Sequence, residues 1–317
     1  MRDLSIVFMG TPDFAVAGLK AILEAGHNVV GVVTAPDRPA GRGQKVKQSA
    51  VKEFALTQNL KILQPTNLKD QNFLDDLKSL KANLQIIVAF RMLPQAVWQM
   101  PEYGTFNLHA SLLPNYRGAA PINWAIIKGD KKTGVTTFFI DEKIDTGEII
   151  LQKEIEIDPD ENAGSLHDKL MNLGSELILE TIDLIAKDKA ITQPQSKKEQ
   201  LNTAYKLNRE NTKIEWSQSI NDIHNLIRGL SPYPVAWSKF ENNGKTDNVK
   251  IYSSRKENID KPTDQPIGKI NIINGKLLVQ VKDGVLNIEE LQLPGKRKMQ
   301  VKDLLNGYSF SEDAKML

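Results

Sequence analysis

The sequence predicts an α/β protein with an N-terminal doubly wound, Rossmann-like parallel-sheet domain and a C-terminal OB-like β-barrel domain. Three observations support this fold class. The chain has 317 residues, 40% of them hydrophobic, which is enough for two cores. Strand and helix patterns alternate in its first half, and short strand patterns separated by tight turns fill its last third. We expect domains at 1–189 and 207–317, joined by a linker at 190–206.

Apolar segments of the first half alternate between strand and helix periodicity. This alternation is typical of βαβ units and therefore of a parallel sheet. Residues 86–90 are apolar at successive positions, as expected of a strand covered on both faces. The expected strands are 4–9, 29–33, 84–90 and 134–140, and the expected helices are 14–25, 50–58, 122–128 and 164–186. Residues 10–13, after the first strand, lack the G-x-G-x-x-G pattern, so no bound dinucleotide is predicted.

A polar segment without periodicity, residues 187–205, separates this region from a different pattern. The expected elements beyond it are a helix at 219–230 and strands at 235–240, 249–254, 267–273, 277–282 and 285–289. Asn243-Gly244, Asn274-Gly275 and Asp283-Gly284 favour tight hairpin turns between the strands. Five such strands predict a small OB-like barrel.

Composition excludes several classes of protein. The net charge of +2 gives no argument for a nucleic-acid partner, so local basic patches must carry that case. The absence of Cys excludes disulfides, a thiolate nucleophile and Cys-based zinc sites, and a cytoplasmic protein is the default expectation. The 4 His residues are scattered without ligand spacing, so no metal is expected. We expect no signal peptide, because the apolar run near the N-terminus is too short and lacks a small-residue cleavage site. We expect no membrane-spanning helix and no membrane partner, because charges, Gly or Pro interrupt every apolar run.

An amide, an imidazole and a carboxylate form the candidate catalytic set. Asn107 and His109 alternate with apolar residues, so both project from one face of a strand. The carboxyl end of such a strand is where open parallel sheets build their sites. Asp145 follows the next expected strand, in the sequence Asp145-Thr146-Gly147. Taken alone, His109 fits a hydrogen-bonded structural histidine, and Asp145, like Asp141, fits a turn former.

The segments around these residues carry a resemblance that covers nearly the whole chain. The chain resembles the methionyl-tRNA formyltransferases at six separated segments in the right order. These segments are 8–14, 36–43, 109–121, 145–147, 231–237 and 294–296.

The resemblance implies transfer of a formyl group from 10-formyltetrahydrofolate to the free α-amine of methionine on initiator methionyl-tRNA. By position, it makes Asn107, His109 and Asp145 the catalytic residues, acting by direct amine attack through a tetrahedral intermediate. Asn107 is expected to donate to the formyl oxygen, and His109 to act as a second donor or proton shuttle. Asp145 is expected to orient His109 and relay the amine proton, and either of these two residues carries that proton.

The predicted folate contacts lie in two segments. Ser111, Leu112, Leu113 and Pro114 match the folate-binding segment of the family. The second segment contains Arg91 and Met92, and here Phe90-Arg91 stands where the family more often has Tyr-Gly. An Arg at this place resembles the glycinamide ribonucleotide formyltransferases. Arg91 is expected either to cover the pterin or to be a solvated charge at the end of a strand.

Two basic segments are the predicted tRNA contacts. Residues 36–47 match a loop that is reduced in small-metabolite relatives, and its bases are Arg38, Arg42, Lys45 and Lys47. From Arg38 to Lys52 the chain has five bases and no acid, and such cations can neutralise phosphates, although a solvated loop is the simpler interpretation. In the second domain, Lys296, Arg297 and Lys298 are expected to hold phosphates, unless they form only a charged hairpin end.

Two other functions fit parts of the sequence. One is a formyltransferase or hydrolase that acts on a small metabolite, which would need neither the basic loop nor the barrel. The other is a non-catalytic tRNA-binding protein, which would not need the Asn107, His109 and Asp145 set. We expect a monomeric enzyme.

Overall fold

The computed structural model describes residues 1–40, 45–196, 201–257 and 265–317, which form two compact units. The first unit comprises 1–118, 133–155 and 167–203. The second comprises 119–132, 156–166 and 204–317. Two segments of the predicted first domain therefore belong to the same unit as the C-terminal residues, whereas the predicted boundaries are contiguous in sequence. The division at 1–189, 190–206 and 207–317 stays a prediction.

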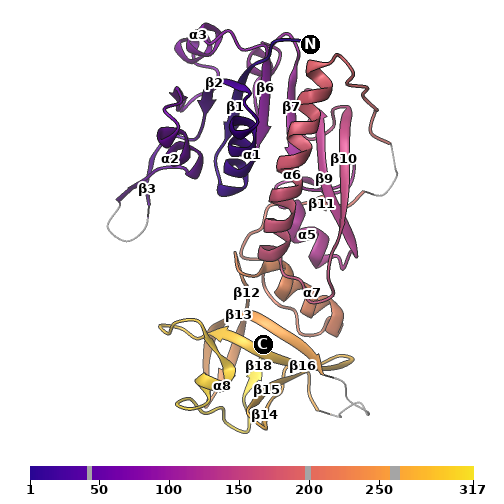
Figure 1. Cartoon of the computed structure of the whole chain (residues 1–317). Helices are drawn as coiled ribbons and strands as arrows, with labels where there is room; N and C mark the ends of the chain where they lie inside the picture. The colour runs from indigo at the N-terminus through magenta and orange to yellow at the C-terminus, as the bar shows by residue number, and fades with distance from the viewer. Residues whose placement is uncertain (41–44, 197–200, 258–264) are drawn as a thin grey trace. The chain divides into compact units, whose positions relative to one another are not determined.

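The first unit is built on a seven-stranded sheet in the order β10-β9-β7-β6-β1-β2-β5 (Figure 1). Neighbouring strands from β7 to β5 are parallel, and β9 runs antiparallel to β7. The strands are β1 (Ser5–Gly10), β2 (Asn28–Val33), β5 (Ile62–Leu63), β6 (Leu84–Val88), β7 (Thr105–His109), β9 (Lys132–Phe139) and β10 (Ile149–Glu156). The predicted doubly wound parallel sheet is confirmed, with an antiparallel edge that the sequence did not indicate.

Helices pack on this sheet through buried apolar faces. Phe8 and Met9 of β1 have no exposed surface. A Cβ at Gly18 would lie 2.8 Å from the Ile178 side chain, so α1 and α6 approach closely here. The helices are α1 (Asp13–Glu24), α2 (Ala50–Thr57), α3 (Gln71–Ser79), α4 (Gln95–Trp98) and α6 (Ala163–Ala186). Those predicted at 14–25, 50–58 and 164–186 are confirmed.

The basic segment 36–47 is partly a hairpin, whereas the sequence predicted a loop. Strand β3 (Arg38–Ala40) pairs antiparallel with β4 (Lys45–Lys47), and Arg38 lies opposite Lys47. Before the hairpin, the Lys52 ammonium lies 2.6 Å from Asp37 Oδ2, and Gln64 Nε2 donates to Asp37 Oδ1 at 2.8 Å. These bonds hold the residue before the hairpin in place. Lys52 is paired with Asp37 and is therefore less available to bind an external anion.

The second unit contains a closed antiparallel barrel in the order β14-β15-β16-β13-β12-β18, with β17 paired to β16. Backbone bonds from Ile270 N to Ala314 O and from Met316 N to Gly268 O join its two edges. The five predicted strands are confirmed, and β17 and β18 are two short additions. The strands are β12 (Ala236–Asn242), β13 (Lys245–Glu257), β14 (Ile270–Ile273), β15 (Lys276–Val281), β16 (Gly284–Gln292), β17 (Met299–Gln300) and β18 (Lys315–Met316).

Two of the three predicted hairpin turns lie where the sequence places them. Asn243-Gly244 and Asn274-Gly275 have positive φ at both residues, as their turn type requires. The third turn is displaced by one residue, because Gly284 pairs with Val281 as part of the strands. Asp283 Oδ1 instead accepts a 2.7 Å hydrogen bond from Ile220 N, which ties this turn to the start of α7 (Ile220–Leu230).

The remaining elements are α5 (Pro121–Ile127) and α8 (Val301–Leu304) of the second unit, and the two-residue strands β8 (Arg117–Gly118) and β11 (Thr203–Ala204). Nowhere in the described part of the chain does a helix have the length and apolar character needed to cross a membrane.

Candidate active site

Strand β7 positions two of the three candidate catalytic side chains. Asn107 and His109 are two residues apart on β7, so they share one face of the sheet. Strand β6 holds one side of Asn107 through its register with Ile87, and β9 holds the other through Phe138. Asn107 is half-buried, and its side-chain amide makes no hydrogen bond to any residue that the structure describes. The amide is therefore available to a ligand.

His109 is buried, with 7% of its surface exposed, and both of its ring nitrogens face protein oxygens. Nε2 lies 2.8 Å from the carbonyl oxygen of Tyr116. A carbonyl oxygen can only accept, so Nε2 carries a proton and donates it. Nδ1 lies 3.8 Å from Asp145 Oδ2. The ring is thus held in one orientation between Tyr116 and Asp145.

Asp145 has left-handed backbone geometry, with φ of 55°. Its Oδ2 accepts a 2.9 Å hydrogen bond from Gly118 N, and its side chain is 14% exposed. Among the residues that the structure describes, none donates to Oδ1. The structure therefore brings Asp145 and His109 together. Oδ2 of Asp145 is engaged by Gly118 N, and Oδ1 has no donor among the described residues.

Close packing fixes the loop that carries Asp145. A Cβ at Gly147 would lie 1.7 Å from the carbonyl oxygen of Phe139, so only Gly fits at this position. Asp141 accepts hydrogen bonds from Lys143 N at 3.0 Å and from the Thr146 hydroxyl at 2.7 Å. The interpretation of Asp141 as a turn former is confirmed.

Gln195 also holds this loop, and sequence reasoning missed it. Its Nε2 donates to the carbonyl oxygens of Asp145 at 2.9 Å and Gly147 at 2.8 Å. Its Oε1 accepts from Arg117 Nε at 3.1 Å and from Arg117 Nη2 at 2.5 Å. Gln195 lies in the polar segment that was predicted to be a linker, where no pattern in the sequence marks it.

The predicted folate segment is braced by its own hydrogen bonds. The Ser111 hydroxyl donates to Asn115 O at 2.7 Å, and Ser111 has no exposed surface. Leu113 N donates to the Thr136 hydroxyl at 3.2 Å, and Leu113 is 3% exposed. Leu112 and Pro114 are half-buried. A ligand can reach the side chains of Leu112 and Pro114 more easily than those of Ser111 and Leu113. Direct contact of this segment with folate stays a prediction.

Arg91 is held by backbone carbonyls. Its Nη1 donates to Thr66 O at 3.0 Å and its Nη2 donates to Pro65 O, so it is not a freely solvated charge. Its Nε is buried and has no hydrogen-bond partner among the described residues. Burial, and after it the charge of Arg38, lowers the pKa of Arg91. Met92 is 68% exposed. The predicted ligand proximity of Arg91 and Met92 is not tested by these contacts.

The charge of Arg38 acts on Arg91, so the structure brings a predicted tRNA residue and a predicted folate residue near each other. Arg38 and Lys47 are exposed on the hairpin. Arg42 lies outside the described residues, as does the side chain of Lys45. Exposed cations beside each other favour an anionic partner.

The basic segment 296–298 of the second unit is exposed, and two of its three cations have partners. Lys296 Nζ lies 5.2 Å from the centre of the Tyr308 ring. Lys298 Nζ lies 3.0 Å from Glu290 Oε2, which partly neutralises it. Arg297 makes no salt bridge to the described residues. Of the three, Arg297 is therefore the cation best placed to bind an external phosphate.

The site brings the amide and imidazole of β7 together with the carboxylate of Asp145 from the loop after β9, and comparison with known proteins shows the family to which the chain belongs. Residues 4–182 match the formyl transferase family, and residues 206–309 match the formyl transferase C-terminal domain. The chain belongs to the formyl transferase family.

Within this family, the chain is similar over its full length to proteins named methionyl-tRNA formyltransferase. The protein of Flavobacterium johnsoniae is 57% identical and covers 100% of both chains. That of Bacteroides fragilis is 51% identical over 99% of this chain and 98% of its own. These relatives place the chain among the methionyl-tRNA formyltransferases.

Solved structures share the fold. A sugar 3N-formyl transferase, crystallised with dTDP and 5-N-formyl-THF, has a TM-score of 0.65 at 22% identity and covers 94% of this chain and 100% of its own. HypX from Aquifex aeolicus, in complex with tetrahydrofolic acid, has a TM-score of 0.65 at 17% identity and covers 96% of this chain and 47% of its own.

Proposed function

We propose that the protein transfers a formyl group from 10-formyltetrahydrofolate to the α-amine of methionine on initiator methionyl-tRNA. The observation that carries the proposal is 57% identity, over the full length of both chains, to a protein named for this activity. The free amide of Asn107 and the free oxygen of Asp145 are the groups that this chemistry needs. The product supplies translation initiation in the cytoplasm, and the enzyme acts as a monomer without a metal.

The amine is the nucleophile, so the protein need supply no covalent catalyst. A free α-amine has a pKa of about 8, and its neutral form attacks a formyl carbon directly. The amine must lose a proton as the new C–N bond forms. Asp145 Oδ1 accepts this proton, because Oδ2 is already engaged by Gly118 N. The leaving nitrogen of the folate takes up a proton as the old C–N bond breaks.

Asn107 stabilises the negative charge that grows on the formyl oxygen. A side-chain amide with no internal partner can donate to that oxygen without first breaking another hydrogen bond. The half-buried position of Asn107 strengthens the interaction, because water competes less there.

His109 supports Asp145. Its Nε2 proton is committed to Tyr116 O, so the ring has no free donor for the formyl oxygen in this arrangement. Its Nδ1 faces Asp145 at 3.8 Å, where the ring fixes the carboxylate and can take a proton from it. This assignment favours Asp145 over His109 as the first proton acceptor.

The two substrates contact different residues and meet at Asn107 and Asp145. We assign the folate to Leu112 and Pro114, with Arg91 and Met92 beside it, and Ser111 and Leu113 shape that segment from within. Arg38 and Lys47 bind tRNA phosphates together with Arg42 and Lys45, and the segment 296–298 adds further contacts.

A formylation assay that compares separate acceptors tests the proposal. The purified protein receives 10-formyltetrahydrofolate with either charged initiator methionyl-tRNA or a panel of small amines, which includes a nucleotide-linked amino sugar and glycinamide ribonucleotide. Formyl product confined to the charged tRNA is expected. Product formed only with a small amine, or release of formate alone, would overturn the tRNA assignment.

A further inference from the structure

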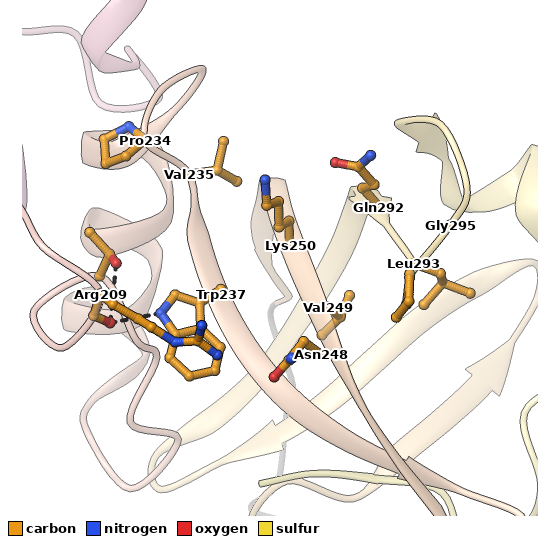
Figure 2. Close-up of a pocket in the computed structure, with 12 residues that line it drawn as sticks. Arg209, Pro234, Val235, Trp237, Asn248, Val249, Lys250, Gln292, Leu293 and Gly295 are labelled. Atoms are coloured by element: carbon orange, nitrogen blue, oxygen red, sulfur yellow. Dashed lines mark hydrogen bonds between the residues drawn. The ribbon is translucent and has the colours of Figure 1, made fainter. Parts of the chain in front are cut away.

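A pocket of about 420 Å³ opens on the barrel of the second unit, separate from the unit that holds Asn107, His109 and Asp145 (Figure 2). Its volume is within the range of small-molecule sites. Its lining combines two cations, an indole, two amides and an apolar surface. The residues are Arg209, Thr212, Pro234, Val235, Trp237, Asn248, Val249, Lys250, Gln292, Leu293, Pro294 and Gly295.

The barrel strands hold the polar side of this pocket in place. Trp237 on β12 lies opposite Lys250 on β13, so their side chains share the outer face of the sheet. Thr212 O accepts from Trp237 N, and Ile214 N donates to Trp237 O. These two bonds hold residues 212–214 along β12. Arg209 lies shortly before them in the chain, and its guanidinium lies 4.8 Å from the centre of the Trp237 ring (Figure 2).

The cations of the pocket are free to bind an anion. Arg209 and Lys250 are exposed, and neither forms a salt bridge with any carboxylate in the described residues. Among the lining residues that the structure describes, there is no Asp or Glu. A guanidinium stacked on an indole is already oriented, so it loses little conformational freedom when it binds a phosphate.

The other side of the pocket is apolar and strained. Val235, Val249 and Leu293 are buried beneath it. Val235 has φ of 81°, a conformation that β-branched residues rarely adopt. Backbone strain of this kind is concentrated at binding sites. The segments 231–237 and 294–296, on which the family resemblance rests in this half of the chain, both contribute lining residues.

We propose that this pocket binds one unpaired nucleotide of the RNA substrate, with its phosphate between Arg209 and Lys250 and its base over the apolar lining. The Asn248 amide can pair with the base edge, whereas the Gln292 amide already donates to Lys296 O at 2.8 Å and accepts from the Tyr252 hydroxyl at 3.1 Å. A base within a duplex has both faces stacked and its pairing edge occupied, so it cannot enter. This inference rests on the proposed function, because tRNA supplies both duplex and unpaired nucleotides.

Binding of short RNA to the full-length protein tests the proposal without any catalytic step. The probes are a single-stranded RNA hexanucleotide, the same hexanucleotide in a duplex, and AMP. The variants are Arg209→Ala and Lys250→Ala, and the matched control is Lys282→Ala, an exposed barrel lysine that is not a pocket residue. We expect the single strand to bind more tightly than the duplex. Each pocket variant should weaken single-strand binding about tenfold and lower the salt slope by about 1, with the control unchanged.

Three results would overturn the proposal. Equal binding of duplex and single strand, lost equally in Lys250→Ala, would mean that only phosphates are recognised. Equal losses in Lys250→Ala and Lys282→Ala would mean non-specific attraction. Binding of AMP without binding of the hexanucleotide would make the pocket a site for a free nucleotide. Failure of the wild-type protein to formylate methionyl-tRNA, with single-strand binding still dependent on Lys250, would overturn the proposed function but not the RNA site.

Discussion

The side-chain amide of Gln195 donates a 2.9 Å hydrogen bond to the backbone carbonyl of Asp145. It links two residues 50 positions apart in the chain, and together with the 2.8 Å bond to Gly147 O it holds the candidate proton acceptor in its left-handed conformation. Gln195 touches no reacting atom in the proposed chemistry, so its role is to position Asp145.

Gln195→Ala should lower kcat about tenfold and leave the KM for the formyl donor nearly unchanged, because a misplaced carboxylate slows proton removal more than binding. Steady-state kinetics with charged tRNA measure both constants. The matched control is Gln193→Ala, because the Gln193 side chain is exposed while its backbone pairs with Ile149. Equal kcat values for the two variants would remove the positioning role.

Gly147→Ala should lower kcat about a hundredfold, because the added methyl group would lie 1.7 Å from Phe139 O and must displace the loop that carries Asp145. Gly307→Ala is the control, since nothing lies within 4 Å of its Cβ position. The measurement is turnover, with circular dichroism to verify folding. A folded Gly147→Ala enzyme with normal turnover would show that the loop position is unimportant.

Asn107→Ala should lower kcat by about 10² to 10³, the usual cost of losing an oxyanion donor. Donor binding should persist, since the amide acts chiefly on charge that develops during the reaction. Turnover and equilibrium binding of folate are measured side by side, with the exposed Asn72→Ala of α3 as the control. A large loss of folate affinity with normal turnover at saturation would instead make Asn107 a binding residue.

His224 gives the second unit a dependence of stability on pH. Burial, and after it the charges of Arg228 and Lys256, lower the pKa of His224 to about 4, and Asp160 opposes this shift. The unfolded chain has the ordinary value of 6.5, so it binds a proton that the folded protein does not. Stability should therefore be constant above about pH 6.5 and fall towards pH 4, by up to about 3 kcal/mol.

Urea unfolding between pH 4 and pH 7.5 measures this slope. His224→Gln should flatten it, whatever the variant does to absolute stability. His167→Gln is the matched control, because the His167 side chain is 37% exposed. A slope that His224→Gln leaves intact would assign the pH dependence to other groups.

The sequence predicts the elements whose signals are local. Continuous apolar runs identify the buried strands β1 and β6, and Asn-Gly pairs identify two barrel hairpins because their backbone conformation suits few other residues. The hairpin of β3 and β4 was missed because its residues are basic and short-range periodicity is absent. The turn at Asp283 is displaced because a tertiary bond to Ile220 competes with local preference.

In the site too, the features with a local sequence signal were predicted and those that depend on distant residues were not. The alternation around β7 predicts that Asn107 and His109 share a face, and the structure agrees. The contact of His109 with Asp145, the free Oδ1 and the role of Gln195 depend on segments far apart in the chain, so no local pattern can reveal them. The hydrogen bonds from Arg91 to the carbonyl oxygens of Pro65 and Thr66 also join distant segments, so the sequence could not predict them.

Single-turnover formyl transfer by Asp145→Asn tests the central claim most directly. The variant is nearly isosteric and keeps an oxygen that can accept from Gly118 N, but it cannot take a proton from the amine. With folate and charged methionyl-tRNA already bound, we predict a rate lower than wild type by about 10² to 10⁴ with unchanged folate affinity. A transfer rate within a few-fold of wild type would contradict the assignment of Asp145 as the proton acceptor.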